Sequence, residues 1–589
     1  MILTIMHTLL SVLANLFQQA TANAFPDLSV LDPNFQPEIT PSTQEKFGHY
    51  QFNSAMKLAK LLKKNPRQVA EAIVNQLTNS LPPLSKIEIA GPGFINMTFS
   101  TDFLSKNLDI LLRDAHFGIP FPEKPEKIII DFSSPNVAKE MHVGHLRSTV
   151  IGDSLARLFE FLGHHVIRLN HLGDWGTAFG MLIAYMKEEV PNVLSGEQKT
   201  DLTHLVSWYR SSKKKFDEEP EFKRRAQLEV VALQQGEQKA REAWQMICEI
   251  SQKAYQEIYQ LLDVKIIDRG ESFYNPFLPN IVSDLEKKGL VKISDGAKCI
   301  FLEGFQNREG ENLPLMIQKS DGGYNYDTTD MAAIYHRIYH EKGDRLIYIT
   351  DAGQATHFQM IFKAAEKAKY LDTTQIRVDH VPFGLVLGTD GKKFRTRSGE
   401  TEKLIDLLRT AINCADKILS EKNPEMEESE RRHLAKSLGI GAIKYADLSC
   451  NRVGDYTFSY DRMLRFEGNT AAFLMYAYVR IAGIKRRLKA NLPAVLENTH
   501  INLEHSTEIE LGLHILRFHE TLNLMANDLL PNRLTDYLYT LAEKFNAFFR
   551  DCRVEGTPQQ NTRLLLCEAT AKVLKQGLTI LGLTTVDKM

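Results

Sequence analysis

Hydrophobic and polar positions in this chain follow two periods, and each period predicts a different kind of element. Residues Ile128 to Phe132 form a short, β-branched apolar run, which is typical of a parallel strand covered on both faces. The polar and turn-forming residues Ser133 to Asn136 end this run, and from Gly144 onward apolar residues recur at helical spacing. The stretch therefore predicts a buried strand, a turn and an amphipathic helix.

Further apolar runs repeat this alternation along the middle of the chain. Strands are predicted at Val166 to Asn170, Asp344 to Asp351 and Ile376 to Phe383. Strands that alternate with helices are typical of an α/β fold with a doubly wound parallel sheet of the Rossmann type. Residues 193–262 are charged and helical in pattern, and we interpret them as an insertion within a central domain of residues 118–460.

The two ends of the chain have patterns of their own. Residues 1–117 begin with apolar residues at helical spacing and continue into strands at Ile87 to Ile89 and Phe94 to Phe99, which predicts an α+β domain. The final part, residues 461–589, is predicted to be an all-α bundle. Its helical apolar spacing extends over residues 470–488, 508–527, 533–549 and 562–580.

Length, charge and cysteine content exclude several classes of protein. A chain of 589 residues needs several domains, since single cores stop growing near about 250–300 residues. A net charge of -2 means that any nucleic acid must be bound by local basic patches. The six cysteines lack zinc-type spacing, so we expect reduced thiols, a cytoplasmic protein and no zinc. The apolar N-terminus lacks the basic start of a signal peptide, and no run is long enough to span a membrane.

Two histidines bracket a glycine at the start of the predicted helix, in the order His142, Val143, Gly144, His145. A helix N-terminus attracts phosphate, and Gly144 allows a nucleotide to lie against bare backbone, with Val143 beside it. The imidazoles of His142 and His145 could donate hydrogen bonds to charge that develops on an α-phosphate. A four-residue pattern is weak by itself, and histidines of a surface loop are the alternative.

This tetrapeptide resembles the HIGH signature of class I aminoacyl-tRNA synthetases. The longer string from Ser133 to Thr149, followed by His171 to Gly176, resembles the bacterial type of arginyl-tRNA synthetase. The likeness extends over nearly the whole chain, to its last residues. It implies that the protein activates L-arginine with ATP and Mg2+ and esterifies it to the terminal adenosine of tRNA(Arg), as a monomer without a resident metal. It also implies that pyrophosphate exchange requires bound tRNA and that the N-terminal domain contacts the tRNA.

A basic loop, residues 389–399, follows the last predicted strand and occupies the place of the class I KMSKS signature. Cations on such a loop can neutralise the departing pyrophosphate, although a basic surface hairpin would contain the same residues. Lys393 matches the first lysine of the signature, whereas Thr396 replaces the second. The resemblance implies that Lys139, before the HIGH sequence, substitutes for it. The predicted catalytic cations are Lys139, Lys393, Arg395 and Arg397, and Phe383 before the loop is a predicted ATP contact.

Carboxylates are expected to select the amino acid, because a guanidinium presents paired donors that a carboxylate can accept. Asp330 and Tyr326 match the guanidinium-binding residues of the family, while Asn136 and Gln354 match residues that hold the rest of the arginine. Asp131 could supply a second carboxylate, or could be a structural or helix-capping aspartate. The predicted arginine-binding residues are Asp131, Ser133, Asn136, Tyr326, Asp330 and Gln354.

The C-terminal part resembles the anticodon-binding domain of the family, where RNA bases stack on aromatic side chains. Phe549 falls where the family's stacking tyrosine can lie, and Met589 falls where the methionine of the closing sequence lies. A basic run could contact phosphates, although each of these residues could instead be a core or solvated residue. The predicted tRNA-binding residues are Lys485, Arg486, Arg487, Phe549 and Met589.

Two other interpretations stay open from the sequence. The first is another class I ligase, such as a cysteinyl type, which the absent zinc cysteines and the carboxylates argue against. The second is a non-catalytic RNA-binding paralogue. The intact His142, His145 and Lys139 argue against that interpretation.

Overall fold

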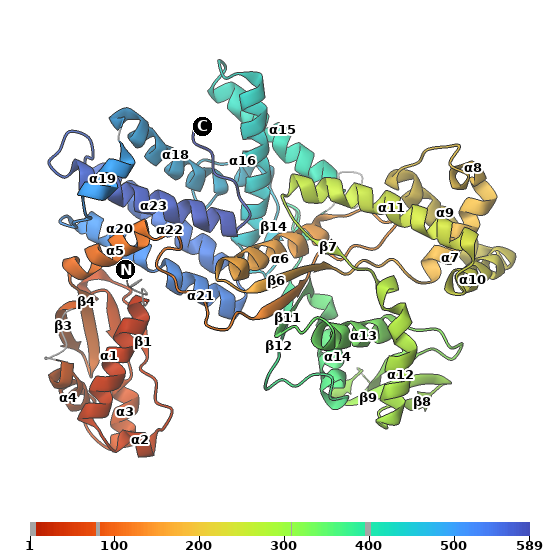
Figure 1. Ribbon diagram of the computed structural model, residues 1–589, viewed down its shortest axis with the longest axis horizontal. Coiled ribbons are helices and arrows are strands. Elements are labelled where there is room, and N and C mark those ends of the chain that lie inside the picture. Colours follow the sequence, from red (N-terminus) through yellow and green to blue (C-terminus); the bar gives the residue numbers. More distant parts are fainter. Residues whose placement is uncertain (1–7, 78–82, 308, 395–401, 490) are drawn as a thin grey trace.

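The central element of the fold is a five-stranded parallel sheet with the order β12-β11-β5-β6-β7 (Figure 1). Its strands are β5 (Lys127–Asp131), β6 (His165–Asn170), β7 (Ile267–Asp268), β11 (Arg345–Asp351) and β12 (Arg377–Phe383). The chain winds outward from β5 to β7 and then returns to β11 on the other side of β5. Ligands of open α/β sheets bind at such a reversal, beyond the carboxyl ends of the strands. The computed structural model describes residues 8–77, 83–307, 309–394, 402–489 and 491–589.

Both faces of this sheet are covered, because successive side chains of a strand point to opposite faces. Ile128 and Ile130 of β5 belong to one hydrophobic core, and Ile129 between them belongs to a second. Helix α6 (Val143–Phe161) contacts β5, β6 and β11, while α13 (Tyr326–Tyr339) and α14 (Ala355–Lys367) supply side chains to the core that contains Ile129. The predicted strand, turn and helix around residue 140 and the doubly wound sheet are confirmed.

A small antiparallel sheet with the order β10-β9-β8 adjoins α13 and α14 and is not predicted by the hydrophobic pattern. Its strands are β8 (Lys292–Ser294), β9 (Ala297–Gln306) and β10 (Asn312–Gln318), and they follow η2 (Glu271–Phe277) and α12 (Leu278–Lys287). The pairing of β9 with β10 is interrupted by register shifts. Such irregular pairing weakens the simple alternation by which a strand is recognised in a sequence.

The region predicted to be an insertion is helical in the structure. It consists of α8 (Pro191–Leu194), α9 (Leu202–Glu218), α10 (Pro220–Gln234) and α11 (Gln238–Leu261), and it follows α7 (Thr177–Glu189). Figure 1 shows these helices at the right of the molecule, with α11 returning toward the central sheet. Tyr255 and Tyr259 of α11 are buried in the main core, so the insertion is attached firmly to the domain of the central sheet.

The N-terminal part is an α+β unit, as predicted, with an antiparallel sheet of order β1-β2-β4-β3. Gly91 to Gly93 turns the chain between β3 and β4. The first apolar residues of the predicted N-terminal helix, Ile2 and Ile5, lie outside the described residues, and Leu9, Leu13 and Phe17 are buried. The elements are α1 (Leu9–Ala24), α2 (Leu28–Leu31), β1 (Ile39–Pro41), η1 (Glu45–Phe47), β2 (Tyr50–Phe52), α3 (Ala55–Leu62), α4 (Pro66–Leu77), β3 (Leu84–Ala90), β4 (Phe94–Phe99) and α5 (Thr101–Arg113).

The C-terminal part is helical, as predicted. The prediction of one helix over 508–527 is wrong, because the chain bends at Arg517, whose guanidinium donates to the Tyr50 hydroxyl and to the His49 carbonyl. A long-range contact therefore decides this break. The helices are α17 (Tyr460–Met463), α18 (Ala471–Leu488), α19 (Leu492–Asn498), α20 (Ser506–Leu516), α21 (Phe518–Asp528), α22 (Asn532–Asp551) and α23 (Gln560–Ile580).

Two long helices and a short strand pair connect the central sheet with the bundle. Helices α15 (Leu404–Lys422) and α16 (Glu428–Leu448) contact each other, and α16 also contacts α6 and α18. Strands β13 (Val386–Leu387) and β14 (Tyr456–Thr457) pair in parallel. In the part of the chain that the structure describes, no helix combines the length and hydropathy needed to cross a membrane.

Candidate active site and RNA-binding surface

Both histidines of the HIGH sequence accept hydrogen bonds from backbone N–H groups at the start of helix α6. The Nδ1 atom of His142, the N-cap residue, accepts a hydrogen bond from the backbone N–H of Gly144 at 3.1 Å, and the Nδ1 atom of His145 accepts one from the backbone N–H of His142 at 3.1 Å. A neutral imidazole whose Nδ1 accepts carries its proton on Nε2. The capping geometry therefore makes both rings Nε2–H donors, at the carboxyl edge of the sheet.

The electrostatic environment keeps both rings neutral. Burial and the nearby charge of Lys393 lower the pKa of His142 below its usual value. Burial, with a smaller contribution from the neighbouring His142, lowers the pKa of His145 to about 3. The ring centroids lie 4.1 Å apart. At neutral pH this pair supplies hydrogen-bond donors rather than acids, which suits the stabilisation of developing phosphate charge.

Gly144 lies too close to this pair to carry a side chain. A Cβ atom at this position would lie 2.9 Å from Cε1 of His142, so the capping ring would have to shift. The Val143 side chain is 4% exposed and belongs to the main core. Any contact of Val143 with a nucleotide is therefore made by its backbone.

The basic loop begins beside the histidines. Lys393 bridges to Leu387, and its charge is close enough to lower the pKa of His142. The residues that follow the loop also lie beside the histidines. Lys403 forms a β-bridge with His142, and the Leu404 N–H donates a hydrogen bond to the Met141 carbonyl at 2.8 Å. Two predicted catalytic cations, Arg395 and Arg397, and the substituting Thr396 lie outside the described residues.

Phe383 ends the edge strand β12 and is 6% exposed. The Arg147 guanidinium lies 5.8 Å from its ring, pairs with the buried Asp447 carboxylate at 3.2 Å and donates to the Gly384 carbonyl at 2.8 Å. Phe383 is thus a packing residue under the site entrance, and its predicted contact with ATP stays a prediction.

A second group of charged side chains lies near the start of α13. His357 of α14 places Nε2 2.6 Å from Asp330 and Nδ1 3.2 Å from Asp327. Burial disfavours the imidazolium, but the hydrogen bonds and charges of Asp327 and Asp330 outweigh it and raise the pKa of His357 to about 9. Burial likewise opposes ionisation of Asp330, yet His357 holds its pKa below the usual value. The result is an ionised carboxylate held by a cation.

The Asp327 carboxylate is fixed by the backbone, because it accepts a hydrogen bond from the N–H of Met316 at 3.0 Å. The unpredicted antiparallel sheet thus anchors this pair of carboxylates. Tyr326 is 56% exposed, and its ring meets the His357 ring edge-on at 5.1 Å. Gln354 lies exposed in the short η3 (Ala352–Gln354) that precedes α14. Asp330 and Tyr326 therefore contact one histidine, His357, that the sequence did not single out, and Gln354 lies three residues before it in the chain.

Asp131 and Ser133 are already engaged within the protein. The Arg337 guanidinium donates to Asp131 at 2.6 Å, and the Ser134 hydroxyl donates to the other carboxylate oxygen at 3.0 Å. The Ser133 hydroxyl lies 2.8 Å from the Tyr259 hydroxyl. These contacts favour the structural alternative for Asp131, and an arginine contact of either residue stays a prediction.

Asn136 lies across the loop from the HLGDWG sequence. Its backbone bridges to Gly173, and a Cβ atom at Gly173 would lie 2.1 Å from the Asn136 Oδ1 atom. Only glycine at position 173 allows this approach. The first loop after β5 and the loop after β6 are thereby joined at the carboxyl edge of the sheet.

Glu271, at the start of η2, is a carboxyl group that the sequence did not single out. Burial and the charges of Asp330 and Asp174 raise its pKa to about 8. Asp174 is itself held by Ser272, whose hydroxyl donates at 2.6 Å. Asp330 and Asp174 thus lie close enough to Glu271 to raise its pKa, and carboxylates are the groups with which a guanidinium pairs. Glu271 lies in a short turn, and a single acidic residue there gives no sequence pattern from which its neighbours in space could be predicted.

The predicted phosphate patch on α18 is largely neutralised by the bundle itself. Lys485 pairs with Glu568 at 2.8 Å, and Arg487 pairs with Glu555 at 2.7 Å. Arg486 donates to the Asp587 carbonyl at 2.9 Å. These cations join α18 to the C-terminal segment, and their contact with tRNA stays a prediction.

An aromatic platform lies beside this patch. The Arg480 guanidinium lies 5.1 Å from the Phe549 ring and 4.9 Å from the Tyr476 ring, and it donates to the Asn546 side chain at 2.5 Å. Tyr476 is 44% exposed. Such a set of rings around a guanidinium is suited to stacking unpaired bases. Met589 packs at the edge of the main core. The sequence pointed to Phe549 and Met589 but not to Tyr476 and Arg480.

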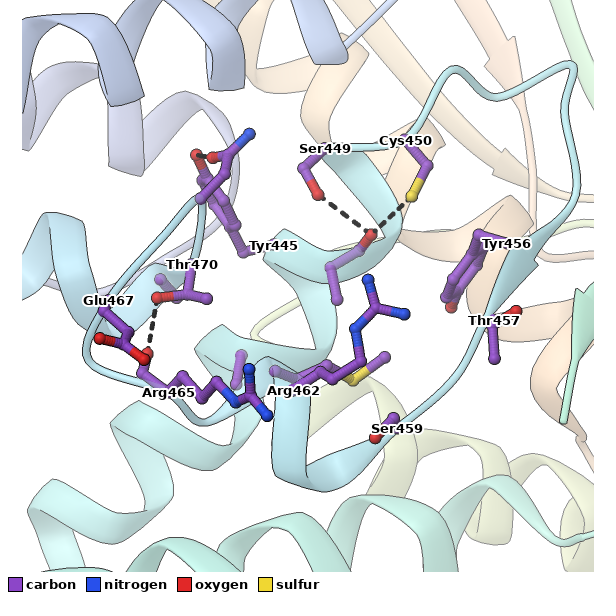
Figure 2. Close-up of a pocket in the computed structure, with 15 residues that line it drawn as sticks. Tyr445, Ser449, Cys450, Tyr456, Thr457, Ser459, Arg462, Arg465, Glu467 and Thr470 are labelled. Atoms are coloured by element: carbon purple, nitrogen blue, oxygen red, sulfur yellow. Dashed lines mark hydrogen bonds between the residues drawn. The ribbon is translucent and has the colours of Figure 1, made fainter. Parts of the chain in front are cut away.

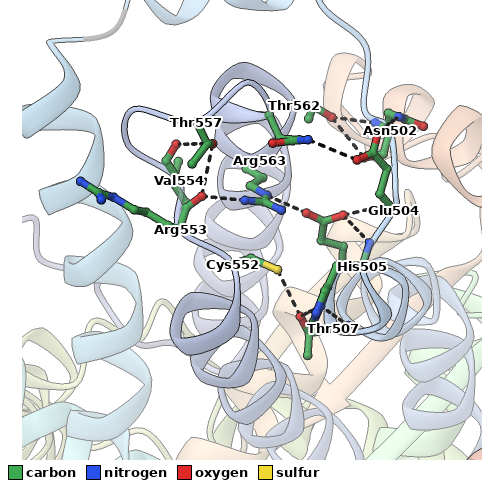
Figure 3. A network of polar contacts seen from close by, with 12 residues as sticks. Asn502, Glu504, His505, Thr507, Cys552, Arg553, Val554, Thr557, Thr562 and Arg563 are labelled. Carbon is green, nitrogen blue, oxygen red and sulfur yellow. Dashed lines mark hydrogen bonds and ion pairs between the residues drawn. The ribbon is translucent and has the colours of Figure 1, made fainter.

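A polar network fixes the turn that follows Phe549 (Figure 3). Arg563 donates to the buried Glu508 carboxylate at 2.7 Å and to the Arg553 carbonyl at 2.8 Å, and the Thr507 hydroxyl lies 3.4 Å from the Cys552 sulfur. The network ties the start of α20 to the end of α22 and to α23. The aromatic platform is therefore held on a rigid part of the bundle.

A hollow of about 380 Å³ lies where α16, β14 and α17 meet the start of α18 (Figure 2). Arg462 and Arg465 line it together with Glu467 and Asn469, and Cys450 at its inner wall donates to the Ala446 carbonyl at 3.3 Å. Two arginines at one hollow are a candidate contact for a phosphate of a polynucleotide that spans both parts. Among the described residues, no group of three or more His, Cys, Asp or Glu side chains could hold a metal ion.

Three families match successive parts of this chain. Residues 108–460 match "tRNA synthetases class I (R), catalytic domain", residues 474–589 match "DALR anticodon binding domain", and residues 11–99 match "Arginyl tRNA synthetase N terminal domain". Fold and site thus define a class I aminoacyl-tRNA synthetase, with an anticodon-binding bundle.

The relatives agree on one member of this class. The chain is 52% identical over 582 residues to the Arginine–tRNA ligase of Chlamydia abortus, which covers 99% of this chain and 100% of that protein. It is 49% identical over 594 residues to the Arginine–tRNA ligase of Trichodesmium erythraeum, again over 99% and 100%. The crystal structure of arginyl-tRNA synthetase from Plasmodium falciparum superposes with a TM-score of 0.87 at 35% identity, over 99% and 100% of the two chains. The protein belongs to the arginine–tRNA ligase family.

Proposed function

We propose that this protein activates L-arginine with ATP and transfers the arginyl group to the 3'-terminal adenosine of tRNA(Arg). The observation that supports it most is that the central domain carries both two neutral, backbone-oriented Nε2–H donors at the start of α6 and an ionised Asp330 held by His357. The first group suits a triphosphate and the second suits a guanidinium. Both lie at the carboxyl ends of parallel strands, where the winding reverses.

In the activation step, the carboxylate oxygen of arginine attacks the α-phosphorus of ATP, and the bond to the bridging oxygen of pyrophosphate breaks. His142 and His145 donate hydrogen bonds to the α-phosphate as its charge grows. Lys139, Lys393, Arg395 and Arg397 neutralise the departing pyrophosphate. Mg2+ enters as the complex with ATP and is held by the phosphate oxygens, as is usual for this ion.

In the transfer step, a ribose hydroxyl of the terminal adenosine attacks the carbonyl carbon of the adenylate, and AMP leaves. Residues 461–589 bind the anticodon loop, with Phe549, Tyr476 and Arg480 as the stacking platform. Residues 118–460 carry the chemistry and residues 1–117 contact the body of the tRNA. The protein acts as a monomer in the cytoplasm.

Exchange of labelled pyrophosphate into ATP tests this function. We expect exchange with arginine and tRNA(Arg) together, charging of the tRNA, and no exchange with lysine. Exchange that depends on another amino acid would refute the specificity. RNA binding without exchange or charging would instead identify a non-catalytic paralogue, and light scattering of the purified protein tests the monomer.

A further inference from the structure

The loop that carries Lys139 has an unusual backbone. Ser133, Ser134 and Ala138 have φ values of 70°, 48° and 60°. This left-handed region is unfavourable for residues with a Cβ atom, and such residues persist where the surrounding structure holds them. The loop joins β5 to the capping His142, so its shape sets the position of Lys139 relative to the HIGH histidines.

One face of the insertion helix α11 holds this loop. Ser251, Tyr255 and Tyr259 follow one another at intervals of four residues, so they lie on the same side of the helix. The Ala138 N–H donates to the Ser251 hydroxyl at 3.1 Å, and the Tyr259 hydroxyl lies 2.8 Å from that of Ser133. Two of the three left-handed residues are thus bound directly by α11.

Tyr255 makes the central contact of this face. Its hydroxyl lies 2.7 Å from the carbonyl oxygen of Asn136 and 2.7 Å from that of Lys139. The side chain is 1% exposed, so water cannot easily replace the hydroxyl as a donor. One phenol therefore fixes the backbone of the lysine and that of a residue predicted to hold arginine.

A second aromatic residue of the insertion, Tyr209, lies near the side-chain ammonium of Lys139. The Lys139 ammonium lies 5.7 Å from the centre of the Tyr209 ring, which belongs to α9. Next to it, Glu140 pairs with Lys403 at 2.8 Å, at the far end of the basic loop. Lys139 is thus held at its backbone by α11 and at its ammonium by α9.

We propose that the helical insertion positions the catalytic lysine: Tyr255 and Tyr209 are positioning residues that hold Lys139 against the phosphates of ATP. This inference rests on the role proposed above for Lys139. Reaction rates are sensitive to a misplacement of about 1 Å, which can cost about 100-fold. The insertion is therefore part of the machinery of activation and not only a solvated attachment.

The substitution Tyr255→Phe removes only the hydroxyl. We expect it to lower kcat of tRNA-stimulated pyrophosphate exchange by about 10- to 100-fold, with a smaller rise of the arginine KM through the loosened Asn136 backbone. The matched control is Tyr537→Phe in α22, whose hydroxyl also lies within hydrogen-bond distance of two backbone carbonyl oxygens, those of His514 and Ile515 at 3.0 and 3.2 Å. The control should keep wild-type kcat. An unchanged kcat in Y255F would overturn the proposal.

Combination with Lys139→Ala separates positioning from a general structural role. If Tyr255 acts through Lys139, Y255F should cause little further loss in a K139A background, measured at high enzyme concentration. An equal loss in both backgrounds would overturn the proposal. A K139A variant with wild-type exchange would instead refute the role of the lysine.

Two measurements support the test without depending on the residual activity of K139A. Amide exchange of Ala138 should be faster in Y255F and unchanged in Y537F, and unchanged exchange in Y255F would count against the clamp. Tyr209→Leu should lower kcat by about threefold, and Tyr209→Phe should restore most of this loss because the ring remains. Equal loss in both Tyr209 variants would remove Tyr209 from the proposal.

Discussion

Arginine binding is expected to strengthen with rising pH because Glu271 must ionise. Burial and the charges of Asp330 and Asp174 raise its pKa to about 8 in the free protein. A guanidinium placed between Asp330 and Glu271 favours the ionised form of both, so Glu271 releases a proton when arginine binds. Asp330 is already ionised, and His357, with a pKa of about 9, stays protonated over the pH range considered.

The magnitude follows from the fraction of Glu271 that is ionised before binding. A raised carboxyl pKa means that the protonated form predominates below pH 8. If arginine binds only the ionised form, the apparent Kd is weakened by a factor of about 100 at pH 6, about 10 at pH 7 and about 2 at pH 8. The linkage therefore operates between pH 6 and pH 8 and fades above pH 8.

Calorimetric titration of the protein with arginine at pH 6.0, 7.0 and 8.0, in two buffers of different ionisation enthalpy, measures both the affinity and the released proton. Glu271→Gln keeps the size of the side chain and should bind arginine with an affinity that hardly changes with pH. The control Glu286→Gln changes a surface residue that pairs with Lys298 and should keep the wild-type slope. A flat profile in the wild type, or the same slope in E271Q, would refute the reasoning.

Three further substitutions test other parts of the site. Asp330→Asn should raise the arginine KM by roughly 100-fold or more, since an unpaired buried charge costs about 3–5 kcal/mol, and an unchanged KM in pyrophosphate exchange would exclude Asp330 from recognition. Gly173→Ala places a Cβ atom 2.1 Å from the Asn136 side chain and should abolish most exchange activity, whereas the control Gly483→Ala meets nothing closer than 3.7 Å and should not. Phe549→Ala should raise the tRNA KM in the charging assay by about 5- to 160-fold, corresponding to about 1–3 kcal/mol for one stacked base, while the arginine KM stays constant.

Much of the fold could be predicted because its signals are local. The alternation of Ile128, Ile129 and Ile130 between two cores follows from the period of a strand, and the capping of α6 by His142 follows from a strand-turn-helix pattern. The register-shifted strands β8 to β10 gave no comparable signal. The break at Arg517 was also hidden, because its cause is a contact with Tyr50 and His49 in another domain.

The residues of the candidate site likewise fall into those that the sequence indicated and those that it did not. His142, His145 and Lys139 are close in sequence, so a single loop could be recognised, and Asp330 was found through its resemblance to the family. Glu271 and His357 come from η2 and α14, and their raised pKa values exist only because the fold places them beside Asp330. The basic run of α18 shows a further limit, because a sequence displays charges but not their partners. Lys485 and Arg487 look available in the sequence, whereas α23 and the loop before it supply Glu568 and Glu555 as partners.

The amino-acid order alone thus determined the parallel sheet, the strand-turn-helix unit around His142 and the helical bundle, since each depends on neighbours within a few residues. Tertiary structure alone decided which groups surround Asp330, which cations of α18 are paired within the protein, and which helix holds the strained loop of Lys139. The physical reason is that charge, burial and hydrogen bonding act through space, so a side chain acquires its pKa and its partners only after distant segments have come together.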